Sequence, residues 1–264
     1  MSPNIYYYWI KNIKSKTKSS KKQNILNKIE KLYHANGGVY GYRKIRKYLA
    51  DEDVYLSPAT VHKYMNKELN LKSLQRRKKR DIVNYPPHKV FNNLIKQNFD
   101  VSEPNKVWCI DFTYVYLSNG SKRYNCTIID LYDRSVVASI NSHRINAELA
   151  IEALKQALAK NKINKGKLIL HSDQGSQFTS KAFVEFCKKC GVQQSMSRKA
   201  TPTDNAPMER YFNTLKNEYI NFYRFNSEKA LYNGINNFAY ITYNHKRKHA
   251  SINYLTPFQK RYAS

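Results

Sequence analysis

The chain has few acidic residues, few cysteines and no long apolar run. Only 19 of its 264 residues are aspartate or glutamate, against 46 lysines and arginines, so the formal net charge is +27. An excess of this size favours a polyanionic partner, with nucleic acid expected and an acidic membrane surface as the alternative. No stretch approaches the roughly 18 apolar residues of a membrane-spanning helix, which disfavours the membrane. The four cysteines do not suggest a disulfide scaffold, and we expect reduced thiols in a cytosolic protein.

The first 22 residues are a basic, serine-containing lead with little apolar pattern, which predicts a mobile tail over residues 1–22. The apolar stretch Ile5–Ile10 is too short for the core of a signal peptide, and no small-residue cleavage site follows it. We therefore expect the folded part to begin after this tail.

Residues 23–74 show a helical pattern that a Gly37-Gly38 pair interrupts. The apolar positions of three predicted helices are Ile25, Leu26, Ile29 and Leu32, then Tyr42, Ile45, Tyr48 and Leu49, then Val61, Tyr64, Met65 and Leu69. The third helix is expected to begin at Ser57-Pro58, because serine is a good N-cap and proline suits the first helical position. This order predicts a helix-turn-helix unit whose last helix enters the major groove. The alternative is a helical hairpin that only packs on the main domain.

A basic cluster, Gln75–Arg80, precedes a proline-containing stretch, Asn84–His88. Such a run is often only a solvated linker, but this one is also suited to follow a phosphate backbone. We therefore predict a basic linker over residues 75–100 and a catalytic domain over residues 101–264.

The second domain begins with three strand patterns and then alternates helices with strands. The predicted elements are strands Val107–Leu117, Tyr124–Leu131 and Ser135–Ile140, helix Ala147–Ala159, strand Leu168–His171, helix Ser180–Lys189, strand Val192–Met196, a helix from Pro207, and a long helix over residues 227–248. The turn Ser118–Ser121 contains an Asn-Gly pair, which is typical of a hairpin. The order βββαβαβα predicts an α/β fold with a mixed five-stranded sheet flanked by helices.

Three carboxylates stand at chemically suggestive positions. Asp111 lies within an apolar, aromatic strand, where a carboxylate is costly unless it is paired or bound to a metal. Asp173 ends the fourth strand, and Glu209 opens a helix. Oxygen ligands that converge from separate elements suit Mg²⁺ or Mn²⁺. Each acid alone could instead be structural, since a buried aspartate accepts hydrogen bonds and a glutamate is favourable at a helix N-terminus.

The spacing of these acids resembles that of a known family. Residues 174–208, thirty-five in number, separate Asp173 from Glu209, and Asp173 stands in a His-Ser-Asp-x-Gly-Ser-x-Phe motif. This is similar to the DD(35)E signature of the integrase and transposase superfamily. Further motifs that resemble OrfB-type transposases of the bacterial insertion-sequence three family are Gly38–Arg43, Ser195–Arg198, Asp204–Ala206, Phe212-x-x-Leu215-Lys216 and Tyr243-Asn244-x-x-Arg247. The resemblance extends from about residue 27 to about residue 260.

The resemblance implies a ribonuclease-H-like fold in which Asp111, Asp173 and Glu209 hold two Mg²⁺ or Mn²⁺ ions. It implies that the enzyme binds terminal inverted repeats, hydrolyses one strand to free a 3′-OH, and uses that 3′-OH to attack target DNA. It further implies a homo-oligomer on DNA, in the cytoplasm and associated with the nucleoid. An upstream reading frame, fused by frameshifting, is a further implied partner.

Several basic residues are candidates for DNA contact. Lys216 lies seven residues after Glu209, about two helical turns, and therefore on the same helix face. It matches the family's basic residue at this place, whereas the alternative is an ordinary surface lysine. The other candidates are Arg198, Lys199, Arg43, Lys44, His62, Lys63, Arg76 and Arg77.

Other polar residues are expected to support the site or the fold. His171 shares the strand face of Asp173 and is interpreted as a hydrogen-bonded support, as is Asn205, although His171 could also line the site. Asp130 and Asp133 are expected to be structural or peripheral, and Asp204 is explained by turn chemistry.

Departures from the family pattern and rival readings remain. Arg210 stands where the family usually has serine, and Lys199–Thr203 replaces a glycine-containing turn, which leaves the loop shape and full activity open.

Cys187 and Cys190 have a CxxC spacing, but structural zinc needs four convergent ligands, so a zinc site is disfavoured. Gly175 is expected to let the chain turn beneath bound DNA. The rival functions are a non-catalytic DNA-binding protein and a ribonuclease-H-type nuclease without strand transfer.

Overall fold

The computed structural model describes residues 20–74, 89–161, 163, 166–199 and 201–263. The chain forms two compact units, Met1–Arg77 and Lys78–Ser264. The predicted tail up to residue 19 and the part of the predicted linker that carries Arg76 and Arg77 lie outside the described residues. Among the helices of the described ranges, none combines the length and the apolar composition needed to cross a membrane.

The first unit is helical and matches the predicted helix-turn-helix organisation. Its helices cover residues 20–35, Tyr42–Ala50 (α2) and Pro58–Lys63 (α3), and α3 continues as a π-helical segment over Tyr64–Glu68. Ser57 caps α3, since its Oγ accepts a hydrogen bond from the Thr60 amide at 3.1 Å. Gly37 and Gly38 adopt φ values of +61° and +74°, which glycine reaches without strain, and so they end the first helix. The fully buried centre of the unit is made of Ile29, Ile45, Leu49, Val61 and Met65.

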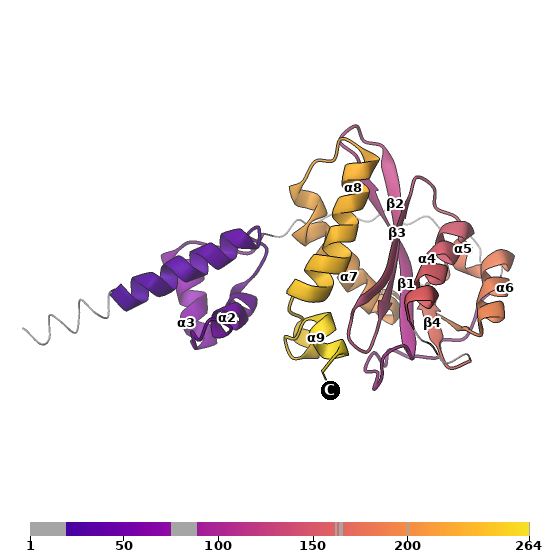
Figure 1. Ribbon diagram of the computed structural model, residues 1–264, viewed down its shortest axis with the longest axis horizontal. Coiled ribbons are helices and arrows are strands. Elements are labelled where there is room, and N and C mark those ends of the chain that lie inside the picture. The colour runs from indigo at the N-terminus through magenta and orange to yellow at the C-terminus, as the bar shows by residue number, and fades with distance from the viewer. Residues whose placement is uncertain (1–19, 75–88, 162, 164–165, 200, 264) are drawn as a thin grey trace, which may run out of the picture. The chain divides into compact units, whose positions relative to one another are not determined.

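The second unit is built on a five-stranded mixed sheet (Figure 1). Its strands are Val107–Tyr116 (β1), Lys122–Asp130 (β2), Val136–Ser142 (β3), Ile169–Ser172 (β4) and Gln193–Met196 (β5). Their order across the sheet is β3-β2-β1-β4-β5; the first three strands are antiparallel, and β4 and β5 continue parallel to β1. The Asn-Gly turn joins β1 to β2, with Gly120 at φ +82°. The predicted mixed five-stranded sheet is therefore confirmed.

Helices cover both faces of this sheet, as Figure 1 shows. The elements are α4 (Ala147–Lys160), α5 (Ser176–Thr179), α6 (Lys181–Cys190), α7 (Ala206–Glu218), α8 (Glu228–Asn236), a π-helix (Asn237–Lys246) and α9 (Pro257–Arg261), with short 3₁₀ turns at Pro202–Asn205, Ile220–Phe222 and Ala250–Ile252. Trp108 and Ile110 of β1 pack with α4, α5 and α6, whereas Cys109 and Val115 pack with α7 and α8. This alternation follows from the two-residue period of a strand.

The predicted long helix over residues 227–248 is present, but its second half is not α-helical. α8 passes directly into the π-helix, which ends at Lys246. At the end of this segment Asn244 is buried, and its side chain pairs with the backbone of Val136 through bonds of 2.8 and 3.0 Å. The helix is thereby attached to the start of β3.

The C-terminal helix is fixed by buried polar contacts. Arg261 donates to Asp130 at 2.6 Å and pairs with Asp133, and both aspartates are fully buried. Burial and the nearby charge of Asp133 raise the pKa of Asp130 to about 6, while Arg261 acts in the opposite direction. Asp130 and Asp133 thus lie in a cluster that anchors α9.

Candidate active site

The register between β1 and β4 brings two of the predicted carboxylates side by side. The parallel pairing runs from Val107 opposite Ile169 to Cys109 opposite His171. The same offset, continued by two residues, sets Asp111 alongside Asp173 just past the end of β4. Because strand side chains alternate, Asp111 shares the sheet face of Cys109, which is the face that α7 covers.

The third carboxylate reaches this place on α7. Met208, Tyr211 and Leu215 are buried against the β1 face that carries Cys109, and this fixes the orientation of the helix. Glu209 lies in the first turn of α7 and is half-buried. Its charge contributes, after burial and Asp173, to raising the pKa of Asp111.

The two aspartates are held where ionisation is unfavourable. Burial raises the pKa of Asp111 well above its usual value, and the charges of Asp173 and Glu209 add to the effect. The Phe112 amide, which donates to Asp111 at 2.7 Å, and the Lys216 ammonium lower this pKa. Asp173 has an exposed side chain, but the protein atoms around it limit hydration and raise its pKa, against a 2.9 Å hydrogen bond from the Gly175 amide. A bound cation would offset this repulsion.

Asn205 lies beside the carboxylates, directly before α7. Its Nδ2 is 3.5 Å from Asp111 Oδ2, at the limit of a hydrogen bond. Its Oδ1 is buried and has no hydrogen-bond partner among the residues that the structure describes. A buried amide oxygen without a partner is unusual, and an oxygen of this kind is a suitable ligand for a hard cation or its water.

The three carboxylates are of the chemical type that binds a divalent ion, but they are not drawn together into one group of ligands. In the part of the chain that the structure describes, no three His, Cys, Asp or Glu side chains are grouped closely enough to hold a metal ion. Cys187 and Cys190 therefore belong to no such group, and both are free thiols. The charges of Asp173 and Glu209 both act on Asp111, and hard oxygen donors of this type are those that Mg²⁺ and Mn²⁺ take.

His171 is placed as a support rather than as a ligand. It is fully buried, with Nδ1 2.9 Å from Ser195 Oγ and Nε2 3.1 Å from Ser197 Oγ. Burial lowers its pKa to about 4, so the ring is neutral at physiological pH. It thus connects β4, which leads to Asp173, to the chain around β5.

Asp204 organises the loop before α7. It is fully buried and accepts hydrogen bonds from the Arg198 side chain, the Arg198 amide, Gln97 and Asn93, at 2.7 to 3.0 Å. The Arg198 guanidinium holds the pKa of Asp204 far below its usual value. Arg198, a candidate for DNA contact, therefore supports this loop and leaves 63% of its side chain exposed, and the neighbouring Lys199 is exposed.

The Lys216 side chain reaches the part of β1 that follows Asp111. Its Nζ lies 4.8 Å from the centre of the Tyr114 ring, and Lys122 Nζ lies 5.3 Å from the same centre. These cation–π contacts place two positive charges three residues along the strand from Asp111. Nothing in the spacing of the sequence singled out Tyr114.

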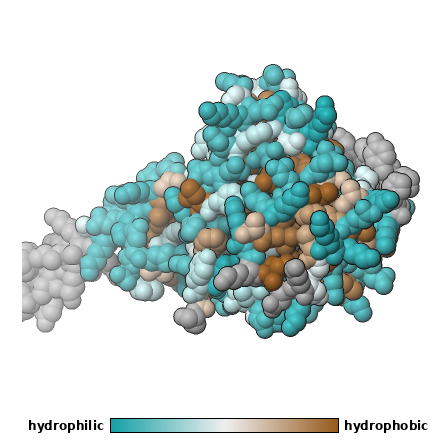
Figure 2. Space-filling model, turned by 45° about the vertical axis from the view of Figure 1, so that its right-hand side comes forward, coloured by the Kyte–Doolittle hydropathy of each residue, from teal (hydrophilic) through white to brown (hydrophobic). Residues whose placement is uncertain are grey.

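In the first unit, the candidate DNA-contact residues lie near the rings of Tyr40 and Tyr42. Arg43 is exposed beside Tyr42, and Lys44 Nζ is 4.3 Å from the Tyr40 ring centre. His62 and Lys63 are exposed on α3, and His62 meets the edge of Tyr42 at 5.0 Å. Figure 2 shows that hydrophilic side chains dominate the face in view, with a smaller hydrophobic area among them.

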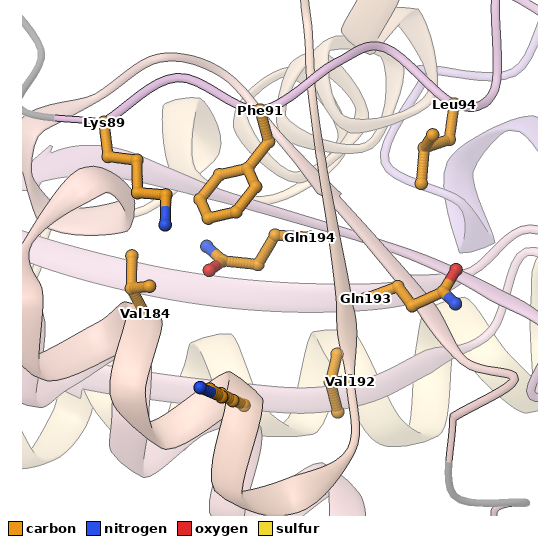
Figure 3. Close-up of a pocket in the computed structure, with 8 residues that line it drawn as sticks. Lys89, Phe91, Leu94, Val184, Val192, Gln193 and Gln194 are labelled. Atoms are coloured by element: carbon orange, nitrogen blue, oxygen red, sulfur yellow. The ribbon is translucent and has the colours of Figure 1, made fainter.

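A hollow of about 380 Å³ lies elsewhere, beside the edge strand β5 (Figure 3). It is lined by Lys89, Phe91, Leu94, Val184, Lys188, Val192, Gln193 and Gln194. None of the three carboxylates lines it, and it contains no acidic ligand for a cation. The chemistry of the acids is therefore separate from this hollow.

Comparison with known proteins identifies the family. Residues 101–202 and 190–257 match the integrase core domain, and residues 20–79 match the HTH-like domain. The chain is 34% identical over 236 residues to the transposase for insertion sequence element IS904 of Lactococcus lactis. This alignment covers 87% of the chain and 90% of that protein. It is 35% identical over 179 residues to the transposase InsF for insertion sequence IS3A of Escherichia coli. This alignment covers 67% of the chain and 62% of that protein. The chain belongs to the insertion-sequence transposases.

The fold agrees with this assignment. The simian T-cell lymphotropic virus intasome, solved by cryo-electron microscopy in complex with PP2A regulatory subunit B56 gamma, contains a chain that matches with a TM-score of 0.52. The match covers 89% of this transposase and 75% of that chain, at 17% identity, and so concerns the fold alone. The predicted ribonuclease-H-like core, the helix-turn-helix-like unit and the insertion-sequence three family are confirmed.

Proposed function

We propose that Asp111, Asp173 and Glu209 are the catalytic carboxylates of this DNA transposase and that they hold two Mg²⁺ or Mn²⁺ ions. The observation that carries the proposal is the parallel register of β1 and β4: continued two residues beyond Cys109 opposite His171, it aligns Asp111 with Asp173. The charges of Asp173 and Glu209 also raise the pKa of Asp111. Bound divalent ions supply activation of the attacking oxygen and stabilisation of the leaving oxygen. They also offset the repulsion between the carboxylates and a scissile phosphate.

The residues of the chain then have separate tasks in two in-line displacements. In the first, a water oxygen attacks the scissile phosphorus and the 3′ oxygen of the terminal strand leaves as a hydroxyl. In the second, that 3′ hydroxyl attacks a phosphodiester of target DNA, and a target 3′ oxygen leaves. Lys216 binds the phosphate backbone near the cut, Asn205 orients Asp111, and the neutral His171 holds the end of β4 that leads to Asp173.

DNA is the partner throughout this scheme. The HTH-like unit, with Arg43, Lys44, His62 and Lys63, binds the terminal inverted repeats, and the core acts on the ends and on target DNA. The enzyme works as a homo-oligomer on DNA. A product of an upstream reading frame, fused by frameshifting, supplies further DNA-binding parts.

A joining assay separates this function from its rivals. Purified transposase is incubated with Mg²⁺ and labelled duplexes that carry the element's terminal repeats, and in parallel with RNA–DNA hybrids. The expected result is a cleaved 3′ end followed by joined products from the duplexes. Cleavage of hybrids without joined products would instead indicate a ribonuclease-H-type nuclease, and binding without any cleavage a non-catalytic protein.

Metal binding can be measured without activity. A cation that binds Asp111 and Asp173 in the folded protein, but not in the unfolded chain, stabilises the fold by mass action. Mg²⁺ or Mn²⁺ at millimolar concentration is expected to raise the melting temperature of the wild type. The rise should disappear in Asp173→Asn, and an equal rise in both proteins would place the bound metal elsewhere.

A further inference from the structure

The part of β1 beyond Asp111 carries an exposed aromatic surface. β4 pairs with β1 only as far as Cys109 and ends at Ser172, so in the described structure β1 continues past its neighbour on that side. Tyr114 and Tyr116 follow on this free part, with 39% and 41% of their surface exposed. Their rings meet edge to face, with centres 5.7 Å apart.

The same surface is strongly basic. Lys122 projects from β2, where it is paired with Tyr116, and therefore lies on the sheet face of both tyrosines. Lys216 comes from α7, which packs on the opposite face, so its side chain extends past the free edge of β1 to Tyr114. The surface, made of Tyr114, Tyr116, Lys122 and Lys216, thus combines aromatic rings with two ammonium groups.

The aromatic surface lies within reach of a DNA strand that is cut at the three carboxylates. Tyr114 is three residues from Asp111, about 10 Å along a strand, and its side chain lies on the other sheet face. The two positions are connected around the edge of β1 by Lys216, whose Nζ is 4.8 Å from the Tyr114 ring centre and whose charge lowers the pKa of Asp111. Successive bases of one DNA strand are about 3.4 Å apart, so a nucleotide within about three steps of the scissile phosphate can reach the ring. Tyrosine rings bind single strands by stacking on the bases, whereas in an intact duplex the base faces are already stacked on each other.

We propose that this surface binds unpaired nucleotides of the DNA strand next to the cut, with Tyr114 stacked on a base and Lys122 and Lys216 on the adjoining phosphates. The proposal rests on the proposed function, since it concerns the DNA strand that the three carboxylates would cut. It makes opening of the duplex at the transposon end part of substrate recognition. An interaction with intact duplex alone would involve phosphates only and would not depend on the ring.

The test compares binding to opened and fully paired ends in protein that cannot cut. The full chain carrying Asp173→Asn is mixed with duplexes that bear the terminal repeat, with the last three nucleotides of one strand either paired or unpaired. The fluorescent adenine analogue 2-aminopurine at the middle position reports stacking. Tyr114→Phe keeps the ring, Tyr114→Leu removes it, and Tyr262→Leu, at a tyrosine that is 73% exposed, is the matched control.

The expected result is quenching by the parent, by Tyr114→Phe and by Tyr262→Leu, but not by Tyr114→Leu. Since stacking on an aromatic residue contributes about 1–3 kcal/mol per base, Tyr114→Leu should bind the opened end roughly 5- to 100-fold more weakly. Its binding to the paired end should change less than about twofold. The inference would be overturned if Tyr114→Leu lost equal affinity for both ends or lost none for either. It would also be overturned if Tyr114→Phe lost affinity for the opened end. Absence of DNA binding by the parent itself would instead overturn the proposed function.

Discussion

Arg247 and Glu218 form an ion pair that fixes the end of α7, the helix that carries Glu209 and Lys216. The Arg247 Nε and Nη2 atoms donate to the two oxygens of Glu218 at 2.6 and 2.7 Å. Only 10% and 13% of the two side chains are exposed, so both charges are largely removed from water. The geometry is bidentate, which is the strongest form of this interaction.

The structure predicts a large loss of stability when only one partner is removed. Arg247→Ala removes the bidentate partner of a nearly buried Glu218 carboxylate, and this costs about 3–5 kcal/mol. For a folded unit of this size, in which 1 kcal/mol corresponds to about 2–4 °C, the melting temperature should fall by roughly 6–20 °C. The double replacement Arg247→Met with Glu218→Leu leaves no unpaired charge and should stay within about 1 kcal/mol of the wild type.

Urea unfolding of the single and double variants measures these differences. The matched control is Arg123→Ala, which breaks another 2.6 Å pair, with Glu228, whose side chain is 44% exposed. Because solvent screens that pair, its loss should cost about 1 kcal/mol or less. The reasoning is refuted if Arg247→Ala costs no more than Arg123→Ala, or if the double variant is as unstable as Arg247→Ala.

Three further predictions concern other parts of the second unit. Asn244→Ala removes both hydrogen bonds to the first residue of β3 and should lower the free energy of unfolding by about 2 kcal/mol in urea. Gly175→Val should abolish joining in the oligonucleotide assay, since a Cβ at this position would lie 2.9 Å from Asp173 Oδ1; full joining activity would contradict this. A carbon-13 NMR titration should place the Asp130 midpoint near pH 6 and lower in Asp133→Asn. Because this acid binds its proton more tightly in the folded state, its contribution to stability should fall as the pH rises from about 4 to 6.

The sequence predicted the sheet because its strands follow regular patterns, and it singled out the three carboxylates as candidates by their positions and spacing. The two-residue alternation of β1, with Trp108 and Cys109 on opposite faces, is visible in the residue types. The spacing between Asp173 and Glu209 is a property of the chain itself. The alignment of Asp111 with Asp173 also depends on the register of β1 against β4, which only the structure shows.

Other features depend on contacts between distant segments and have no local signal. Arg247 and Glu218 stand far apart in the sequence, and their types alone did not show that they pair. Gly234 occurs inside a helix because the Tyr219 hydroxyl lies where a side chain would begin, 2.2 Å from an added Cβ. The π-helical half of residues 228–246 was missed because buried Leu231, Ile235, Ala239 and Tyr243 keep a spacing of four, which fits an ordinary α-helix.

Removal of each carboxyl group tests the central claim most directly. Joining of terminal-repeat DNA in Mg²⁺ is measured for the wild type, Asp111→Asn, Asp173→Asn and Glu209→Gln, with Glu185→Gln as control because that side chain is 65% exposed on α6. Residues that act as one unit each remove most of the activity when changed alone. The expected result is loss of cleavage and joining in all three variants, by at least about 1,000-fold, with full activity in Glu185→Gln. Cleavage near the wild-type rate in any one of the three would contradict the assignment of these acids as a single catalytic set.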